Sequence, residues 1–156
     1  MPLYFEDFVV GAVRETEART VTEADIVQFC GVSGDFNPLH TDAVFAATTP
    51  YGGRVAHGLL TLSIATGLTQ RRGELHGTAI AFLGMEEWRF HAPVMPGDTI
   101  HVRETVLERS ATSNPGRGVV KRRIEVVNQT EVVVQSGVWV TLIRRRPGTD
   151  VEEARE

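Results

Sequence analysis

The sequence predicts an α+β fold in which a long antiparallel β-sheet curls around one central apolar helix. The helical pattern from about His57 to Gln70 carries apolar residues around most of its circumference, so this helix belongs inside the protein. From Thr78 onward the pattern becomes extended, with the long β-branched stretches that are typical of strands. A sheet wrapped around a helix covers the apolar surface of both elements.

A first helix is expected near residue 22, well before the central helix. Thr22 is placed to cap its N-terminus, and Asp25, three residues later, completes an Asp variant of the capping box. The helix is expected to run to about Cys30, because Gly31 and Gly34 are residues that end helices. Cys30 is the only cysteine and cannot form an intrachain disulfide, so we interpret it as a small buried hydrophobic residue.

A second, shorter helix is expected from Thr41, as its N-cap, through Ala47. Just before it, Pro38 disfavours helical backbone angles at Asn37. Residues 35–40 are therefore expected to form a bent, extended loop that leads into this helix.

The second half of the chain contains four extended runs, at residues 78–91, 100–106, 119–127 and 132–143. In the second run, Ile100, Val102 and Val106 share one face of the strand. Turn-forming residues at 96–98 (Pro-Gly-Asp) and 128–130 (Asn-Gln-Thr) separate neighbouring strands. The chain therefore turns between the strands of one long antiparallel sheet.

Length, charge and apolar composition limit the number of domains and the kinds of partner that the protein can have. The 156 residues fit one domain, expected over residues 1–146 and followed by a charged tail over residues 147–156. The net charge of −4 argues against nucleic acid as the main partner, because phosphate binding needs a positive surface. The acidic N-terminal segment does not resemble a secretory signal, and the longest apolar stretch, 59–68, is too short to cross a bilayer. We therefore expect a cytoplasmic protein with no membrane partner.

The stretch GDFNPLHTD places a carboxylate, Asp35, and an imidazole, His40, on either side of an Asn-Pro step. If the loop doubles back, both side chains can point at one water molecule and act as a general acid/base pair near neutral pH. The alternative interpretation is a structural one. Asp and Asn are turn formers, so Asp35 could stabilise a turn and His40 could simply begin a helix.

A second candidate feature is the start of the central helix, where Gly58 follows His57. A helix N-terminus presents unpaired N–H groups, and a carbonyl oxygen docked beside Gly58 would be stabilised as it gains negative charge. The alternative is that Gly58 allows close packing, and for His57 we favour an ordinary capping role. Ser63, inside the same helix, is expected to hydrogen-bond back to its own backbone.

Together GDFNPLHTD, HGLLTLS and FHAPVMPGD resemble the MaoC-like dehydratases, and especially the R-specific enoyl-CoA hydratases, over roughly residues 5–143. The resemblance implies the hot-dog fold and a homodimer with acyl-CoA in a tunnel between the subunits. It implies that Asp35 and His40 are the catalytic pair and that the Gly58 N–H helps to form the oxyanion hole. It also implies that Asn37 and Ser63 support the site.

The activity implied by the resemblance is reversible addition of water to a trans-2-enoyl thioester, giving an (R)-3-hydroxyacyl thioester, on coenzyme A or acyl carrier protein. No metal is expected, because the thioester already acidifies the α-proton and the helix start stabilises the developing charge. No separate cofactor is expected either, because coenzyme A is part of the substrate. A thioesterase on the same fold is one alternative, although such enzymes generally carry an acidic residue on the central helix and residues 59–68 contain none. A non-catalytic acyl-binding or assembly subunit is the other.

Residues around the substrate are harder to assign from sequence. The loop at 48–56 and the strand around Phe82 are expected to line the acyl tunnel, and His91 either lines the pocket or faces solvent. Three arginines are candidates for the coenzyme A phosphates, although isolated arginines are more often simply solvated: Arg71, Arg72 and Arg117.

Overall fold

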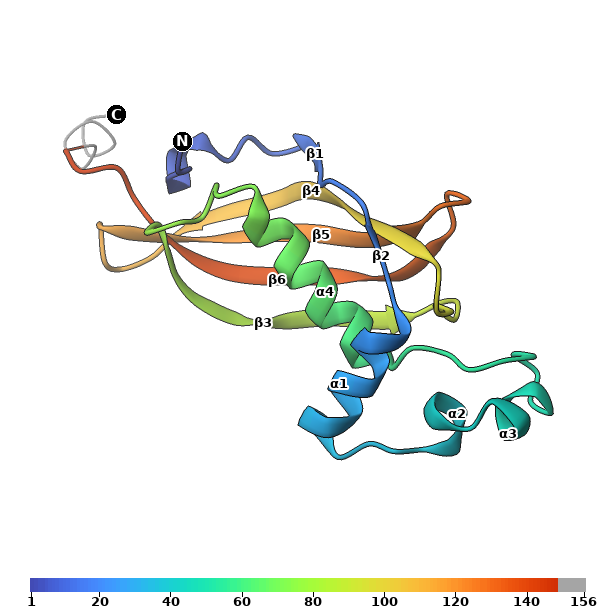
Figure 1. Cartoon of the computed structure of the whole chain (residues 1–156). Helices are drawn as coiled ribbons and strands as arrows, with labels where there is room; N and C mark the ends of the chain where they lie inside the picture. Colours follow the sequence, from blue (N-terminus) through green and yellow to red (C-terminus); the bar gives the residue numbers. More distant parts are fainter. Residues whose placement is uncertain (149–156) are drawn as a thin grey trace.

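The computed structural model describes residues 1–148 and contains one antiparallel sheet of six strands. Its order is β1-β4-β5-β6-β3, and β2 also pairs with β4 (Figure 1). The strands are β1 (Val13–Glu15), β2 (Arg19–Thr20), β3 (Ala79–Phe90), β4 (Thr99–Ala111), β5 (Arg117–Asn128) and β6 (Val133–Arg144). The expected antiparallel sheet is confirmed, with β1 and β2 as two short additions that the sequence pattern did not reveal.

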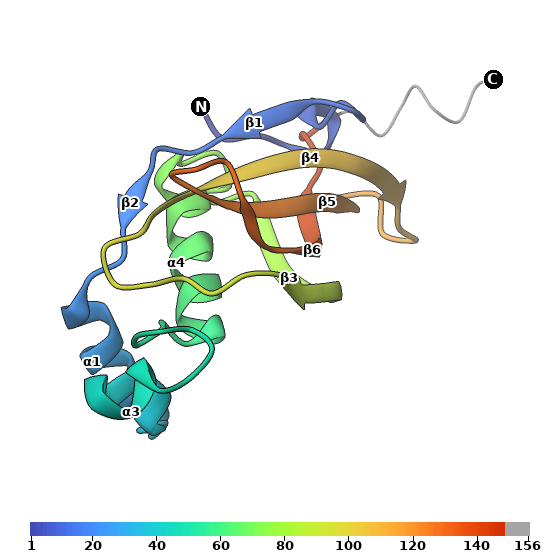
Figure 2. The ribbon, with the colours of Figure 1, turned by 90° about the vertical axis from the view of Figure 1, so that its right-hand side faces the viewer.

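The central helix is α4 (Gly58–Arg71), and it lies across one face of the curved sheet (Figures 1 and 2). Its buried residues include Leu62, Ile64 and Leu68, which pack with strand residues such as Ile124 and Trp139 in one core. The expected apolar helix inside a sheet is therefore confirmed.

The helix α1 (Glu23–Ser33) begins and ends as its sequence predicts, within a few residues. The Thr22 hydroxyl accepts a hydrogen bond from the Asp25 N–H, and the Asp25 carboxylate accepts one from the Thr22 N–H. Gly34 closes the helix in the left-handed conformation, where a glycine carries no steric cost. Cys30 is buried, as expected.

The region after α1 differs from its prediction. Two short helices form, α2 (Pro38–Thr41) and α3 (Ala43–Ala47), and they are capped by Asn37 and Asp42. Thr41 is thus the last residue of α2 and not the cap of a helix. The expected loop at residues 35–40 is also wrong in its second half, because proline is well tolerated at the first position of a helix. With α1, these helices form a unit beyond one end of α4 (Figure 1).

A buried ion-pair network ties the far end of α4 to the sheet. The Glu104 carboxylate of β4 accepts hydrogen bonds from Arg122 of β5 and from Arg72, which follows α4. Arg72 therefore does not lie in solvent, and it sits at the opposite end of α4 from Gly58. This placement does not suit a role in binding coenzyme A beside Gly58.

The arginine run at the end of β6 is held against the N-terminal segment by ion pairs. Arg145 and Arg146 form ion pairs with Glu6 and Asp7 in the N-terminal 3₁₀ turn η1 (Phe5–Asp7). The expected tail at residues 147–156 lies outside the described residues from 149 onward. Within residues 1–148, no helix combines the length and the apolar composition that a membrane crossing requires.

Candidate active site

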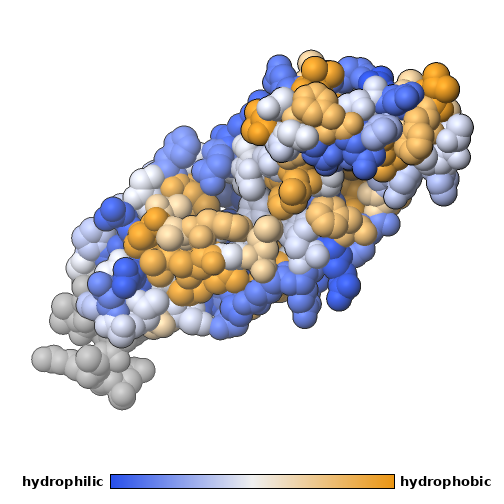
Figure 3. Space-filling view, turned by 90° about the horizontal axis from the view of Figure 1, so that it is seen from below, coloured by the Kyte–Doolittle hydropathy of each residue, from blue (hydrophilic) through white to orange (hydrophobic). Residues whose placement is uncertain are grey.

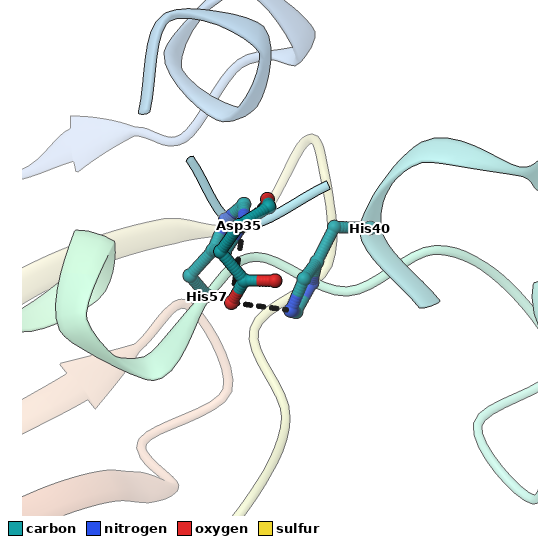
Figure 4. A group of neighbouring side chains, drawn as sticks. All are labelled: Asp35, His40 and His57. Atoms are coloured by element: carbon teal, nitrogen blue, oxygen red, sulfur yellow. Dashed lines mark hydrogen bonds and ion pairs between the residues drawn. The ribbon is translucent and has the colours of Figure 1, made fainter. Parts of the chain in front are cut away.

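Asp35 lies in the short connection between α1 and α2, where its backbone is held at both sides. Its N–H donates to the Ser33 hydroxyl, and its Oδ1 accepts from the Asn37 N–H at 3.1 Å, which forms an Asx turn. The second carboxylate oxygen, Oδ2, lies 4.0 Å from His40 Nε2 (Figure 4). The turn-forming and the chemical interpretations of Asp35 are thus compatible, because each uses a different carboxylate oxygen.

His40 is carried by α2, and the N-cap of that helix is Asn37, whose side chain accepts from the Leu39 N–H. His40 Nδ1 lies 2.7 Å from the Val55 carbonyl oxygen. A carbonyl can only accept, so Nδ1 carries the proton and the lone pair of a neutral ring is at Nε2, on the side of Asp35. The loop before α4 therefore selects the tautomer of His40.

His57 is the third member of this cluster, and sequence reasoning assigned it only a capping role. It is the N-cap residue of α4, but its side chain makes no capping bond. Instead the buried ring stacks on His40, with centroids 3.7 Å apart, and Nε2 lies 3.0 Å from the Asp35 carbonyl oxygen. The capping interpretation of the side chain is therefore wrong. The only sequence feature that pointed toward His57 was its position next to Gly58, the candidate oxyanion donor.

Gly58 is the first residue of α4, and none of the described residues accepts a hydrogen bond from its N–H. Its carbonyl oxygen accepts from Gln135 Nε2 at 3.0 Å, and Gln135 Oε1 accepts in turn from the Trp88 indole. A Cβ on Gly58 would come within 2.5 Å of the Phe90 ring, so any side chain here would force that ring to move. Its φ is not positive, and no unusual backbone angle is involved.

An open pocket of about 430 Å³ connects His40 with Gly58. The loop before α4 contributes to its wall, as expected, and His91 also lines it, with Nε2 2.7 Å from the Ser136 hydroxyl. The remaining lining residues are mostly apolar: Leu39, Tyr51, Val55, Ala56, Leu59, Thr61, Phe90, Ala92, Pro93, Val94 and Gln135. The pocket thus presents an imidazole and a free helix N–H within an apolar wall.

Other residues proposed from sequence lie elsewhere. Ser63 donates to the Leu59 carbonyl, as expected for a helical serine, and lines a groove between α1 and α4 rather than this pocket. Phe82 lines a further pocket, beside the second half of α4. Arg71 borders the α1–α4 groove, and Arg117 begins β5. The structure therefore places His40 and Gly58 at one pocket and the Asp35 carboxylate 4.0 Å from His40, while Asn37 caps α2 and Ser63 lines a different groove.

The cluster of Asp35, His40 and His57 has ligand atoms within 4.8 Å of one another, a spacing that a metal ion could bridge. The hydrogen bond from His57 opposes this use, because the nitrogen nearest the cluster carries a proton that it donates to the Asp35 carbonyl. A metal ligand needs a free lone pair at that position. The donor set therefore fits proton transfer better than metal binding.

Comparison with known proteins gives a consistent family. Residues 7–130 match the model of the MaoC like domain. Over 102 residues the chain is 47% identical to "Protein MaoC" of Klebsiella aerogenes, and over 106 residues it is 38% identical to a 3-hydroxybutyryl-CoA dehydratase of Methylorubrum extorquens. These alignments cover 65% and 68% of this chain but 30% and 65% of the two relatives, so the chain spans less than two thirds of either.

Solved structures agree. A monoamine oxidase regulatory protein from Archaeoglobus superposes with a TM-score of 0.87 at 40% identity, covering 94% of this chain and 97% of that one. The R-hydratase PhaJ1 of Pseudomonas aeruginosa superposes with a TM-score of 0.77 at 31% identity, covering 93% and 88%. A Mycobacterium tuberculosis protein described as a double hot-dog fold matches at 22% identity, with a TM-score of 0.82 over 94% of this chain and 46% of that one, and shows the fold alone.

Proposed function

The chain belongs to the MaoC-like dehydratase family, and from that premise we propose that it catalyses the reversible hydration of trans-2-enoyl thioesters to (R)-3-hydroxyacyl thioesters. The observation that carries the proposal is the spacing of Asp35 and His40. Their facing atoms, Oδ2 and Nε2, are 4.0 Å apart. This distance is too long for a direct hydrogen bond, and one water oxygen between them can contact both.

The proton balance follows from this pair. Hydration removes one proton from the attacking water and adds one to Cα, so the pair needs one exchangeable proton in total. The member without the proton accepts from water as its oxygen bonds to Cβ, and the other member protonates Cα. His40 takes part through Nε2, because Val55 occupies Nδ1. Transfer between the two side chains then restores the starting state.

The thioester oxygen is proposed to lie at the Gly58 N–H. As water adds to Cβ, electron density moves onto this oxygen, which becomes an enolate. An N–H at a helix start, near the positive end of the helix dipole, stabilises that charge. The thioester itself acidifies Cα, so the scheme needs no metal or further cofactor.

We propose acyl-CoA as the substrate, with acyl carrier protein as the other carrier that the chemistry allows. A thioesterase activity is the main alternative. The helix α4 supports hydration over hydrolysis, because it carries no aspartate or glutamate that could activate water there.

The test is a panel of trans-2-enoyl-CoA and enoyl-acyl carrier protein substrates of increasing length. Hydration is measured as loss of the conjugated-thioester absorbance. Product configuration is read by coupling to dehydrogenases specific for (R)- or (S)-3-hydroxyacyl-CoA. Thiol release is followed in the same samples. Rapid (R)-product formation without thiol release is expected, whereas thiol release alone would favour the thioesterase, and neither signal would favour a non-catalytic role.

A further inference from the structure

His57 makes a contact that neither packing nor helix capping requires. Its ring is buried, and its polar contacts within residues 1–148 are all at Nε2. The Asp35 carbonyl oxygen lies 3.0 Å from this nitrogen, and the Cys30 sulfur lies 3.7 Å away. The carbonyl can only accept, so Nε2–H is the donor of this bond.

This bond restrains Asp35 at its main chain. The carboxylate is held separately, because Oδ1 accepts from the Asn37 N–H. With the carbonyl and Oδ1 both engaged, Oδ2 is the oxygen that remains, at 4.0 Å from the nearest nitrogen of each histidine. Figure 4 shows the Asp35 carboxylate beside the two histidine side chains.

His57 also supports His40. The two rings are stacked, with an interplanar angle of 28° and centroids 3.7 Å apart. The His57 ring therefore blocks rotation of the His40 ring on that side. On its edge, His40 is held by the Val55 carbonyl. One buried ring therefore contacts both members of the acid/base pair.

His57 precedes Gly58 in the chain, so a single peptide unit joins this ring to the proposed oxyanion donor. We propose that His57 is a positioning residue that holds Asp35 and His40 in register with the Gly58 N–H. The inference rests on the proposed function. Hydration requires water at Cβ, a proton at Cα and a donor at the thioester oxygen, three points whose mutual positions are set by the substrate. A misplacement of about 1 Å costs such a reaction on the order of 100-fold in rate.

The test compares two substitutions of His57, by glutamine and by asparagine, which place the side-chain N–H donor at different distances from the main chain. In His57→Gln the side-chain NH₂ reaches the position of Nε2, whereas in His57→Asn it reaches only that of Nδ1. His57→Asn and His57→Leu are expected to lower kcat by about 10- to 100-fold, with KM changed less than about threefold. His57→Gln is expected to recover most of the lost kcat. Cys30→Ala, which removes the other polar contact of the ring, is the matched control and is expected to retain near-normal kcat.

A mutant cycle separates positioning from general stability. If His57 acts through the acid/base pair, adding His57→Leu to a variant that carries both Asp35→Asn and His40→Gln is expected to lower the residual activity less than about threefold further. If His57 has only a structural role, the loss of activity from His57→Leu multiplies with the loss from the other substitutions. In that case the Gln and Asn variants at position 57 also have equal kcat when their melting temperatures are equal. Either of these two results would overturn the inference.

The wild-type protein provides a readout that does not depend on activity. Long-range ¹⁵N–¹H NMR spectra of the imidazole rings are expected to show the Nε2–H tautomer for His57, and an Nδ1–H tautomer would refute the inference. Failure of the proposed function would appear differently, as absence of turnover by the wild-type chain on every thioester.

Discussion

At the residue scale, Asp35 combines two roles that sequence reasoning had to treat as rivals. One oxygen stabilises the turn at Asn37, and the other faces His40. A turn that uses only one oxygen leaves the second oriented toward His40, so the structural role is compatible with the proposed chemical role. The same holds for Asn37, which caps the helix that carries His40.

Asp35→Asn and His40→Gln are each expected to lower kcat by about 10²- to 10⁴-fold, the usual contribution of general acid/base catalysis. Both substitutions introduce an uncharged amide of similar size, and the amide of Asp35→Asn retains an oxygen for the Asx turn. Steady-state hydration kinetics on the best thioester of the panel provide the measurement. Near-normal turnover by either variant would remove that residue from the mechanism.

Gly58→Val is expected to lower hydration at least about 100-fold, as does loss of an oxyanion donor elsewhere. The structure adds a complication, because any Cβ at this position meets the Phe90 ring. Phe90→Ala removes the clash and serves as the reference background. If Gly58→Val costs nothing in that background, the glycine serves packing alone and the thioester oxygen binds elsewhere.

At the element scale, the helix α1 packs beside the site, where the Phe29 ring contacts the His57 ring. The start of α1 depends on Asp25. Burial alone would raise the pKa of Asp25, but hydrogen bonds from Thr22 and Arg19 outweigh it and hold the pKa below its usual value. The capping box is therefore a charge-dependent contribution to stability.

Asp25→Ala is expected to destabilise the protein by about 1 kcal/mol at pH 7, as loss of a helix cap does. Because the folded-state pKa is lowered, this stabilisation is complete above the unfolded-state pKa of about 4 and is lost as pH falls through the folded-state value. Urea unfolding at pH 7 and pH 3 tests this. The difference between wild type and variant should shrink at pH 3, and a constant difference would show that the carboxylate charge is irrelevant. Glu17→Ala, outside the capping box, is the control.

At the scale of the whole molecule, the prominent feature is the free edge of β3, whose backbone groups on that side pair with no other strand of residues 1–148. This 12-residue strand pairs with β6 on its other side. It exposes Ile80, Phe82, Leu83 and Met85, and Figure 3 shows apolar surface gathered on the underside of the molecule, where β3 lies in Figure 1. A long apolar edge strand commonly pairs with another chain.

We therefore predict a homodimer formed through β3, with twice the 17.2 kDa mass of the chain in light scattering. Leu83→Lys places a charge at this edge and is expected to shift the mass toward that of a monomer and to lower activity. Val9→Lys, at a similarly exposed apolar residue before β1, should leave the dimer intact. A wild-type protein that is monomeric and fully active at assay concentration would contradict the prediction.

Much of this architecture could be predicted from local sequence signals. The capping box at Thr22, the glycine that closes α1 and the apolar pattern of α4 each depend on residues within one or two turns of helix. The four long strands show their own extended pattern. The bounds of three of them lie within two residues of those observed, whereas the run expected at 100–106 continues to Ala111 in β4. The choice of Thr41 as a cap failed because Asp42, the neighbouring residue, accepts hydrogen bonds from two N–H groups at the start of α3.

Sequence by itself therefore determined the fold class, the family resemblance and the residues Asp35, His40 and Gly58 as candidates. Tertiary structure decided how they are used. The Asp35–His57 contact joins residues 22 positions apart, and the Gln135–Gly58 contact joins residues 77 positions apart. Neither has a local pattern, because a hydrogen bond between distant segments depends on where the whole sheet and helix place them. The tautomer of His40 and the contact of His57 with Asp35 both follow from such contacts.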